Sequence, residues 1–123
     1  MNSRILLTLS ILFVCISNCK SDDDDINCTL QYVYGLNISI KNANTNNVIT
    51  EDITITATDG NYQETLMRIE SSNSFFGAGE RAGNYIITIT SPNYQTFTSN
   101  TIKVTSDECH VIPKQIEFSI QPN

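Results

Sequence analysis

Large apolar residues alternate with smaller or polar residues along most of the chain after residue 28, which is the period of a half-buried β-strand. The clearest run is residues 80–97, ERAGNYIITITSPNYQTF, where every second residue from Tyr85 to Ile89 is large and apolar. Pro92 and Asn93 then provide a turn, because proline presets φ and asparagine tolerates unusual backbone angles. This stretch therefore predicts a strand, a turn and the start of a second strand.

Further strands are predicted at residues 36–40, 53–58, 62–69, 101–105 and 109–121, the last most clearly at Ile116, Phe118 and Ile120. Asp59-Gly60 is a hairpin signal, and Pro113 indicates a bulge or an edge position because it cannot donate to a β-ladder. Residues 71–83 are the least regular part, where Phe75, Phe76, Gly77 and Gly79 suggest a short strand or bulge and a loop. No helical periodicity of useful length occurs. The pattern predicts a single antiparallel Greek-key β-sandwich of about seven strands, with a small closed barrel as the alternative.

The first 18 residues do not follow this pattern, and we expect them to be a signal peptide. A single positive charge precedes the apolar run ILLTLSILFVCI, and about a dozen apolar residues are too few to span a bilayer, which takes roughly 20. An N-terminal anchor helix is the alternative. The sequence thus predicts three parts: a signal peptide (1–18), a tether (19–27) and a folded domain (28–123).

The end of the apolar run, Ile16-Ser17-Asn18-Cys19, resembles a bacterial lipobox, although Asn18 departs from the usual small residue. The resemblance implies that Cys19 carries an N-acyl and diacylglyceryl (palmitate-type) anchor. Cys15 is an alternative lipidation site, but the residues before it match the lipobox less well.

An acidic segment follows the lipobox, and it resembles the export signal of surface lipoproteins in some Gram-negative bacteria. This export signal would consist of Lys20, Ser21, Asp22, Asp23, Asp24 and Asp25. Physically it is a hydrated, self-repelling tether, and a plain acidic linker would look the same. Together these features predict an outer-membrane or cell-surface protein.

Two cysteines, Cys28 and Cys109, remain in the domain, and an exported protein permits them to form a disulfide. Two unpaired buried thiols are the alternative. The formal net charge of −6 argues against nucleic acid as a partner, because nucleic-acid binding needs a basic surface.

Four motifs carry a family resemblance: Asp59-Gly60, ERAGNY at 80–85, SPNY at 91–94 and CHV at 109–111. They are similar to the carboxypeptidase regulatory-like family, whose members are transthyretin-like (prealbumin-like) β-sandwiches, often lone lipoprotein domains. The resemblance covers roughly residues 28–122. Ala82 stands where the family often has proline, and a second cysteine pair, near Glu51 and Phe75 here, is missing. The missing pair implies a less constrained loop over residues 71–79.

Candidate chemistry is sparse. A zinc peptidase needs two histidines and a glutamate as ligands, and the chain has one histidine. We expect His110 to be a strand residue beside the disulfide, pointing away from Cys109, and the turn at Asp107 and Glu108 to be hydrated rather than metal-binding. Glu80 is expected to accept backbone N–H bonds and close its loop onto the next strand.

The sequence therefore predicts a non-enzymatic, lipid-anchored β-sandwich without a cofactor or metal. Its expected partners are the membrane, through Cys19, and an envelope protein, a glycan or a host protein. Contacts are expected from residues 71–79 or from an exposed sheet face. An exposed Phe75 or Phe76 would be the best candidate for a contact, and the alternative is that both rings pack under the loop. The alternative function is an envelope hydrolase or its accessory subunit, because paired carboxylates can converge in space without a sequence signature.

Overall fold

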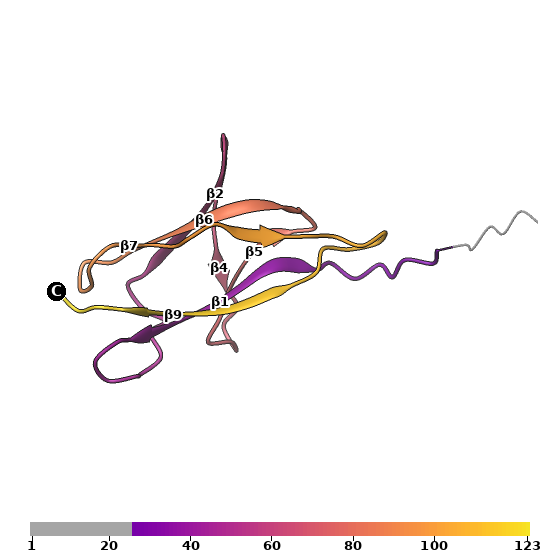
Figure 1. The fold of residues 1–123 in the computed structure, drawn as a ribbon. Helices are drawn as coiled ribbons and strands as arrows, with labels where there is room; N and C mark the ends of the chain where they lie inside the picture. The colour runs from indigo at the N-terminus through magenta and orange to yellow at the C-terminus, as the bar shows by residue number, and fades with distance from the viewer. Residues whose placement is uncertain (1–25) are drawn as a thin grey trace, which may run out of the picture.

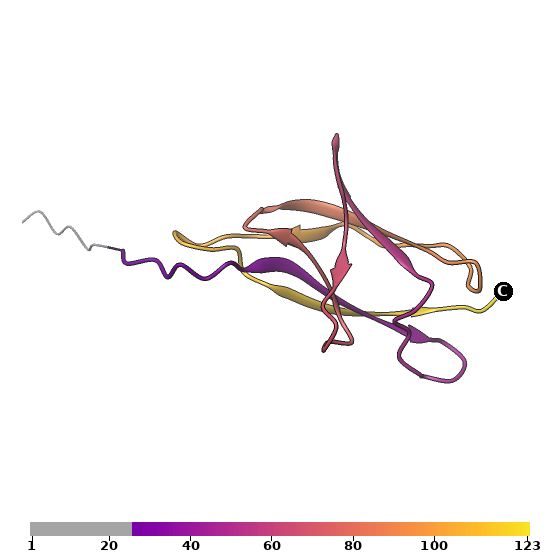
Figure 2. The same cartoon turned by 180° about the vertical axis from the view of Figure 1, so that it is seen from behind.

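A computed structural model describes residues 26–123, so the predictions for residues 1–25 lie outside its range. Within that range the regular structure is entirely β, with no helix. Its strands are β1 (Tyr34–Asn42), β2 (Thr54–Asp59), β3 (Tyr62–Thr65), β4 (Met67–Arg68), β5 (Phe75–Gly79), β6 (Gly83–Thr90), β7 (Phe97–Thr98), β8 (Ile102–Val104) and β9 (Lys114–Ile120). Figures 1 and 2 show them from opposite sides as two layers.

The first sheet, which we call sheet A, has the strand order β4-β5-β1-β9. β1 is antiparallel to β5 but parallel to β9, with Leu36 opposite Lys114 and Asn42 opposite Ile120. The prediction of a wholly antiparallel sandwich is therefore wrong for this pair. Alternation carries no information on strand direction. Parallel pairing needs a long connection between the two strands, and most of the domain lies between β1 and β9 in the sequence. Pro113 directly precedes β9, an edge strand, as its missing N–H predicts.

The second sheet, sheet B, has β6 at its centre. β2 pairs with one side of β6, and β3 continues the sheet beyond β2. The other side of β6 is shared, since β7 pairs with Thr88 and Ile89 while β8 pairs with its first three residues. Ser99 lies between β7 and β8 and exchanges two 2.8 Å hydrogen bonds with the backbone of Ile87. The second half of the 80–97 motif thus becomes a strand only at Phe97.

Residues 62–69 do not form the single return strand that we expected. β3 pairs with β2 in sheet B, whereas β4 pairs with β5 in sheet A. Buried Leu66 stands between them, and its N–H donates to Ile55 O over 2.8 Å. The chain therefore crosses from one sheet to the other at this residue. This split, together with β5 in the irregular segment, raises the strand count of the described residues to nine from about seven.

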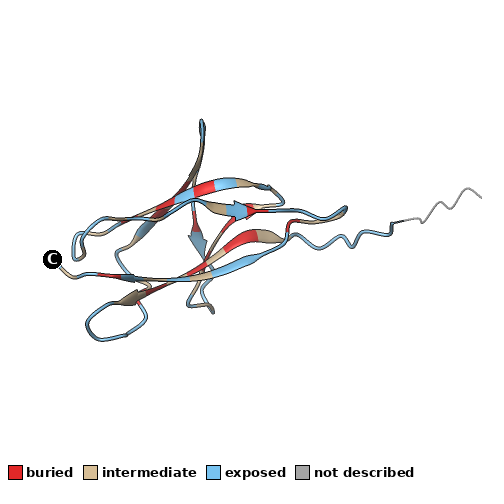
Figure 3. Ribbon diagram, in the orientation of Figure 1, coloured by how far each residue is buried: buried red, intermediate tan, exposed pale blue. Residues whose placement is uncertain are grey.

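The buried residues form one core cluster between the sheets. Figure 3 shows the buried segments, in red, on strands of both layers. The alternating residues Leu36, Ile38 and Ile40 face it from β1, and Tyr85, Ile87 and Ile89 face it from β6, all with no exposed surface. Burying a large apolar side chain contributes about 1.5–3 kcal/mol, so these two strands stabilise the fold most. Two sheets packed over one core agree with the predicted β-sandwich, and the barrel alternative is wrong.

Across residues 26–123, no helix has the length and apolar character needed to cross a membrane.

Candidate functional site

The chain enters the sandwich at one end, and a disulfide fastens it there. Cys28, six residues before β1, is bonded to Cys109 in the turn between β8 and β9, with 5.2 Å between their Cα atoms. Figure 1 shows residues 26–33 leaving the sandwich beside this turn, opposite the end that carries the C-terminus. The predicted pairing is therefore confirmed.

His110 adds a second fastening at this end. Its Nδ1 lies 2.7 Å from Glu80 Oε1, and its Nε2 lies 3.0 Å from Thr29 Oγ1 and 3.1 Å from Thr29 O. The imidazole thus bridges the entering segment and the loop before β6. His110 lies in a bend and not in the predicted strand, because residues 107–110 fold back on themselves: Asp107 N–H donates to His110 O over 2.9 Å.

Glu80 completes this cluster, which we call the entry clamp: Cys28, Cys109, Thr29, His110 and Glu80. The same Oε1 that faces His110 accepts a 2.8 Å hydrogen bond from Val33 N–H. The prediction that Glu80 accepts a backbone N–H is confirmed, but the donor precedes β1 instead of lying in the next strand. Partial burial raises the pKa of Glu80, and the bonds from Val33 and His110 outweigh it, so the pKa lies below its usual value.

Thr29, His110 and Glu80 stand in the order hydroxyl, imidazole, carboxylate, which is also the order of a hydrolase triad. A general base needs an unprotonated Nε2. Here Nε2 faces two atoms of Thr29, its hydroxyl and its carbonyl oxygen, and the carbonyl oxygen can only accept a hydrogen bond. An N–H that donates from Nε2 to this carbonyl would leave the Thr29 hydroxyl without a base, and the cluster would then serve as a clamp.

Arg81, beside Glu80, organises the far side of the loop before β6. Its Nη1 lies 3.0 Å from Asp59 Oδ2 and 2.9 Å from the Tyr85 hydroxyl, which donates back to Arg81 O over 2.8 Å. The guanidinium also lies 3.7 Å from the centre of the Tyr62 ring, a cation–π distance. The ERAGNY motif therefore locks the β2–β3 hairpin to the start of β6, and its charged residues serve structure.

The outer face of sheet A carries a different set of side chains. Strand register places Met67, Phe76, Asn37 and Gln115 in one row across the sheet. Ser39 and Glu117 are paired one step further along β1 and β9. Paired residues of neighbouring strands point to the same face, so these side chains form a continuous surface.

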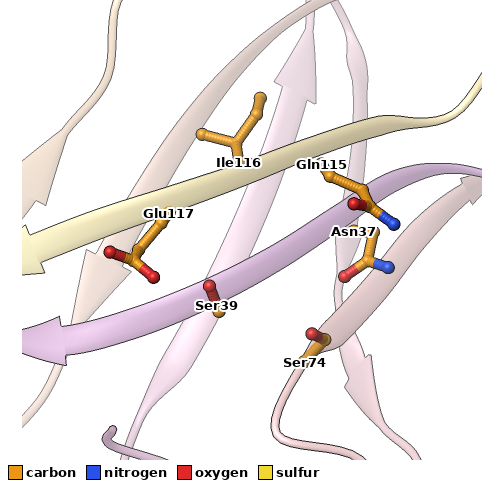
Figure 4. A pocket seen from close by; sticks show the side chains of 6 residues that line it. All are labelled: Asn37, Ser39, Ser74, Gln115, Ile116 and Glu117. Carbon is orange, nitrogen blue, oxygen red and sulfur yellow. The ribbon is translucent and has the colours of Figure 1, made fainter. Parts of the chain in front are cut away.

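A shallow hollow of about 250 Å³ lies on this outer face. Its lining residues are Asn37, Ser39, Ser74, Gln115, Ile116 and Glu117. Figure 4 shows the polar side chains gathered over β1, β9 and the approach to β5, while Ile116 points away from them. The hollow is therefore lined by amide, hydroxyl and carboxylate groups.

An aromatic cluster begins at Phe76, beside this hollow, and continues away from it. Phe76, directly opposite Asn37, lies 5.7 Å from the ring centre of Tyr34, which in turn lies 5.2 Å from Tyr32. Tyr34 reaches this face because the alternation breaks at Gly35. Both Gly35 and Leu36 are buried, and a Cβ on Gly35 would lie only 2.6 Å from Val104 Cγ1.

Residues 71–79 contain the short strand that was one of the two expectations for this segment, since Phe75–Gly79 forms β5 between β4 and β1. Phe75 is buried and Phe76 half-buried, so the second phenylalanine is the one that reaches the outer face. Sequence reasoning did not find Asn37, Gln115 or Thr29 as site residues. Their partners lie on strands distant in sequence, and an isolated amide or hydroxyl gives no local signal.

The lipidation residue Cys19 and the export residues Lys20, Ser21, Asp22, Asp23, Asp24 and Asp25 lie outside the described residues. Within residues 26–123, no three histidine, cysteine or acidic side chains stand close enough to hold a metal ion. The turn at Asp107 instead uses its carboxylate to accept 2.8 Å bonds from the N–H groups of Cys109 and His110.

No protein-family model matches the chain, and a search of curated proteins found no similar sequence.

Proposed function

We propose that the chain is a lipid-anchored, non-catalytic β-sandwich of the bacterial envelope that serves as a binding or structural module. In this proposal residues 1–18 are the signal peptide, Cys19 carries the lipid, and the acidic segment that follows directs export to the cell surface. The fold would be the Greek-key, transthyretin-like sandwich of the carboxypeptidase regulatory-like family, as its motifs imply.

The entry clamp is the observation that carries the proposal. The residues that follow the acidic segment are held by a disulfide, by His110 and by the bond from Val33 N–H to Glu80. A mechanical force on the membrane tether would act on the domain at this point. A covalent bond at the entry would carry that force, so that it does not act on β1. Among the described residues, the outer sheet faces and the opposite end take no part in the entry clamp.

Lipidation at Cys19 is tested by Cys19→Ser in cells fed with labelled palmitate. We expect the variant to lose the label and to leave the membrane fraction, since acyl chains provide the anchor. Cys15→Ser is the matched control, and it should keep both the label and the membrane association. A Cys19→Ser protein that stays membrane-bound and labelled would refute the anchor.

Surface export is tested separately by deleting residues 21–25. Because the segment is predicted to be an unfolded tether, the domain should fold as before while its exposure to protease added outside intact cells decreases. Unchanged exposure would mean that the acidic run is only a linker.

The alternative function is an envelope hydrolase, favoured by the order Thr29, His110, Glu80 in the clamp. A fluorophosphonate probe, which labels activated hydroxyl nucleophiles, tests it directly. We expect no labelling of Thr29. Labelling that disappears in Thr29→Ala would establish the hydrolase instead.

A further inference from the structure

We propose that the hollow on the outer face of sheet A binds a neutral carbohydrate chain. This inference rests on the proposed function as a binding module and specifies its ligand class. The starting point is the row Phe76, Asn37, Gln115, in which neighbouring strands bring an aromatic ring and two amides side by side.

The polar groups of the hollow match the hydroxyls of a sugar. Each sugar hydroxyl both donates and accepts hydrogen bonds, and side-chain amides and hydroxyls do the same. Asn37 and Gln115 supply amides, Ser39 and Ser74 supply hydroxyls, and all four stand around one hollow (Figure 4). Asn37, Ser39 and Ser74 are half-buried, so neighbouring groups restrict their orientation.

The charges around the hollow favour an uncharged ligand. Glu117 lies on its rim and is paired with Lys41 over 3.2 Å, so the nearby cation is already neutralised. The chain as a whole carries a formal net charge of −6. An anionic ligand such as a phosphate, a nucleic acid or a polyuronate would meet repulsion here.

The aromatic residues beside the hollow provide the other half of a carbohydrate site. The faces of sugar rings present C–H groups, which pack on the negative face of an aromatic ring. Phe76 borders the hollow at Asn37, and Tyr34 and Tyr32 continue the aromatic surface along the start of β1. Tyr32 is 61% exposed, which makes its ring available to a ligand.

The size and shape of the hollow suit a chain better than a single small molecule. A volume of about 250 Å³ is below that of most enclosed small-molecule pockets, which begin at about 300 Å³. It lies on an open sheet face, so a polymer can continue past it on either side. One or two sugar units would occupy the hollow, and a neighbouring unit would lie on the aromatic surface.

The test uses the full chain carrying Cys19→Ser, so that it does not depend on membrane attachment. The probes are neutral hexasaccharides of glucose, mannose and galactose, with a hexauronate as the charged probe, measured by titration calorimetry. We expect at least one neutral hexasaccharide to bind and the hexauronate to bind at least tenfold more weakly. Absence of binding to every neutral probe, or preference for the hexauronate, would overturn the proposal.

Two variants locate the site. Asn37→Ala/Gln115→Ala should weaken binding at least about tenfold, as expected for the loss of hydrogen bonds worth about 1.4 kcal/mol in total. Phe76→Ala should also weaken it. Thr56→Ala/Thr88→Ala changes a cross-strand pair on sheet B and should bind like the parent chain. Equal binding by all variants with unchanged melting temperatures would refute the location.

The outcomes separate this inference from the anchor. If the wild-type chain is membrane-attached but no sugar binds, only the proposal of a carbohydrate site is refuted. If sugar binds but the wild-type chain is not lipidated, only the proposal of a lipid anchor is refuted.

Discussion

Gly83 is the residue at which the ERAGNY motif leaves no room for a side chain. A Cβ at this position would collide with Asp59 Oδ2 and would lie 2.9 Å from Arg81 Nη1. These two atoms form the ion pair that joins the β2–β3 hairpin to the loop before β6. A glycine is therefore needed here because the Asp59–Arg81 ion pair lies so close to its Cα. Backbone conformation is not the reason, since the φ of Gly83 does not lie in the left-handed region.

Gly83→Ala is accordingly expected to destabilise the domain by about 1–3 kcal/mol, because the added methyl group must displace the ion pair. The measurement is the free energy of unfolding in urea. Asn84→Ala, at the exposed neighbouring position, is the control and should change this energy by less than about 0.5 kcal/mol. Equal stability of the two variants would contradict the close contact.

Glu80 makes the stability of the entry clamp depend on pH. Its folded-state pKa is below the ordinary 4.5, so the carboxylate stabilises the fold above pH 4.5, and that contribution is lost as the pH falls through the folded-state pKa. Asp107, whose pKa is lowered by the backbone N–H groups of His110 and Cys109, acts in the same direction. We therefore expect the melting temperature to fall as the solution is acidified below about pH 4.5.

Glu80→Gln isolates this effect, because the amide oxygen can still accept the bond from Val33 but carries no charge. The variant should melt below the wild type at pH 7, and the difference should shrink on acidification. Glu51→Gln, an exposed carboxylate, controls for net charge. A difference that stays constant from pH 7 to pH 3 would show that the charge of Glu80 does not matter.

At the scale of the elements, the least expected feature is the segment that belongs to both sheets. β3 and β4 are separated by the single residue Leu66, which is 4% exposed and packs where a Cβ on Gly77 would lie. The side chain therefore fills the corner that the crossing creates.

Leu66→Ala should cost about 2–5 kcal/mol, the usual range for removing a fully packed leucine side chain. Met67→Ala is the matched control one residue on, at a position that is 67% exposed, and it should have little effect on unfolding in urea. A small loss at Leu66 would mean that the corner can collapse around the missing side chain.

Alternation predicted which residues of the elements are buried, and it did so well for Leu36, Ile38 and Ile40 and for the matching residues of β6. It could not predict the crossing at Leu66, since the period of two is the same in either sheet. Nor could it predict the parallel pairing of β1 with β9, or the break at Gly35 that turns Tyr34 outward. These depend on which strands become neighbours, and the binding face of sheet A depends on the same long-range pairing.

For the molecule as a whole, the disulfide determines how firmly the ends are held. Cys28 and Cys109 are 81 residues apart, so the bond closes most of the domain into one ring. Only residues 110–123, which include β9, lie beyond it on the C-terminal side. Breaking the bond would therefore increase the conformational entropy of the unfolded chain, and it would change the contacts of the folded state much less.

Cys28→Ser/Cys109→Ser is therefore expected to lower the free energy of unfolding by up to about 4.5 kcal/mol, the chain-entropy value for a loop of this length. The fold should persist, because the core between the sheets does not include either cysteine. Urea unfolding of the wild type in excess reductant should give the same midpoint as the variant. If the variant instead unfolds at the midpoint of the oxidised wild type, the bond does not stabilise the domain, and the entry clamp rests on His110 and Glu80 alone.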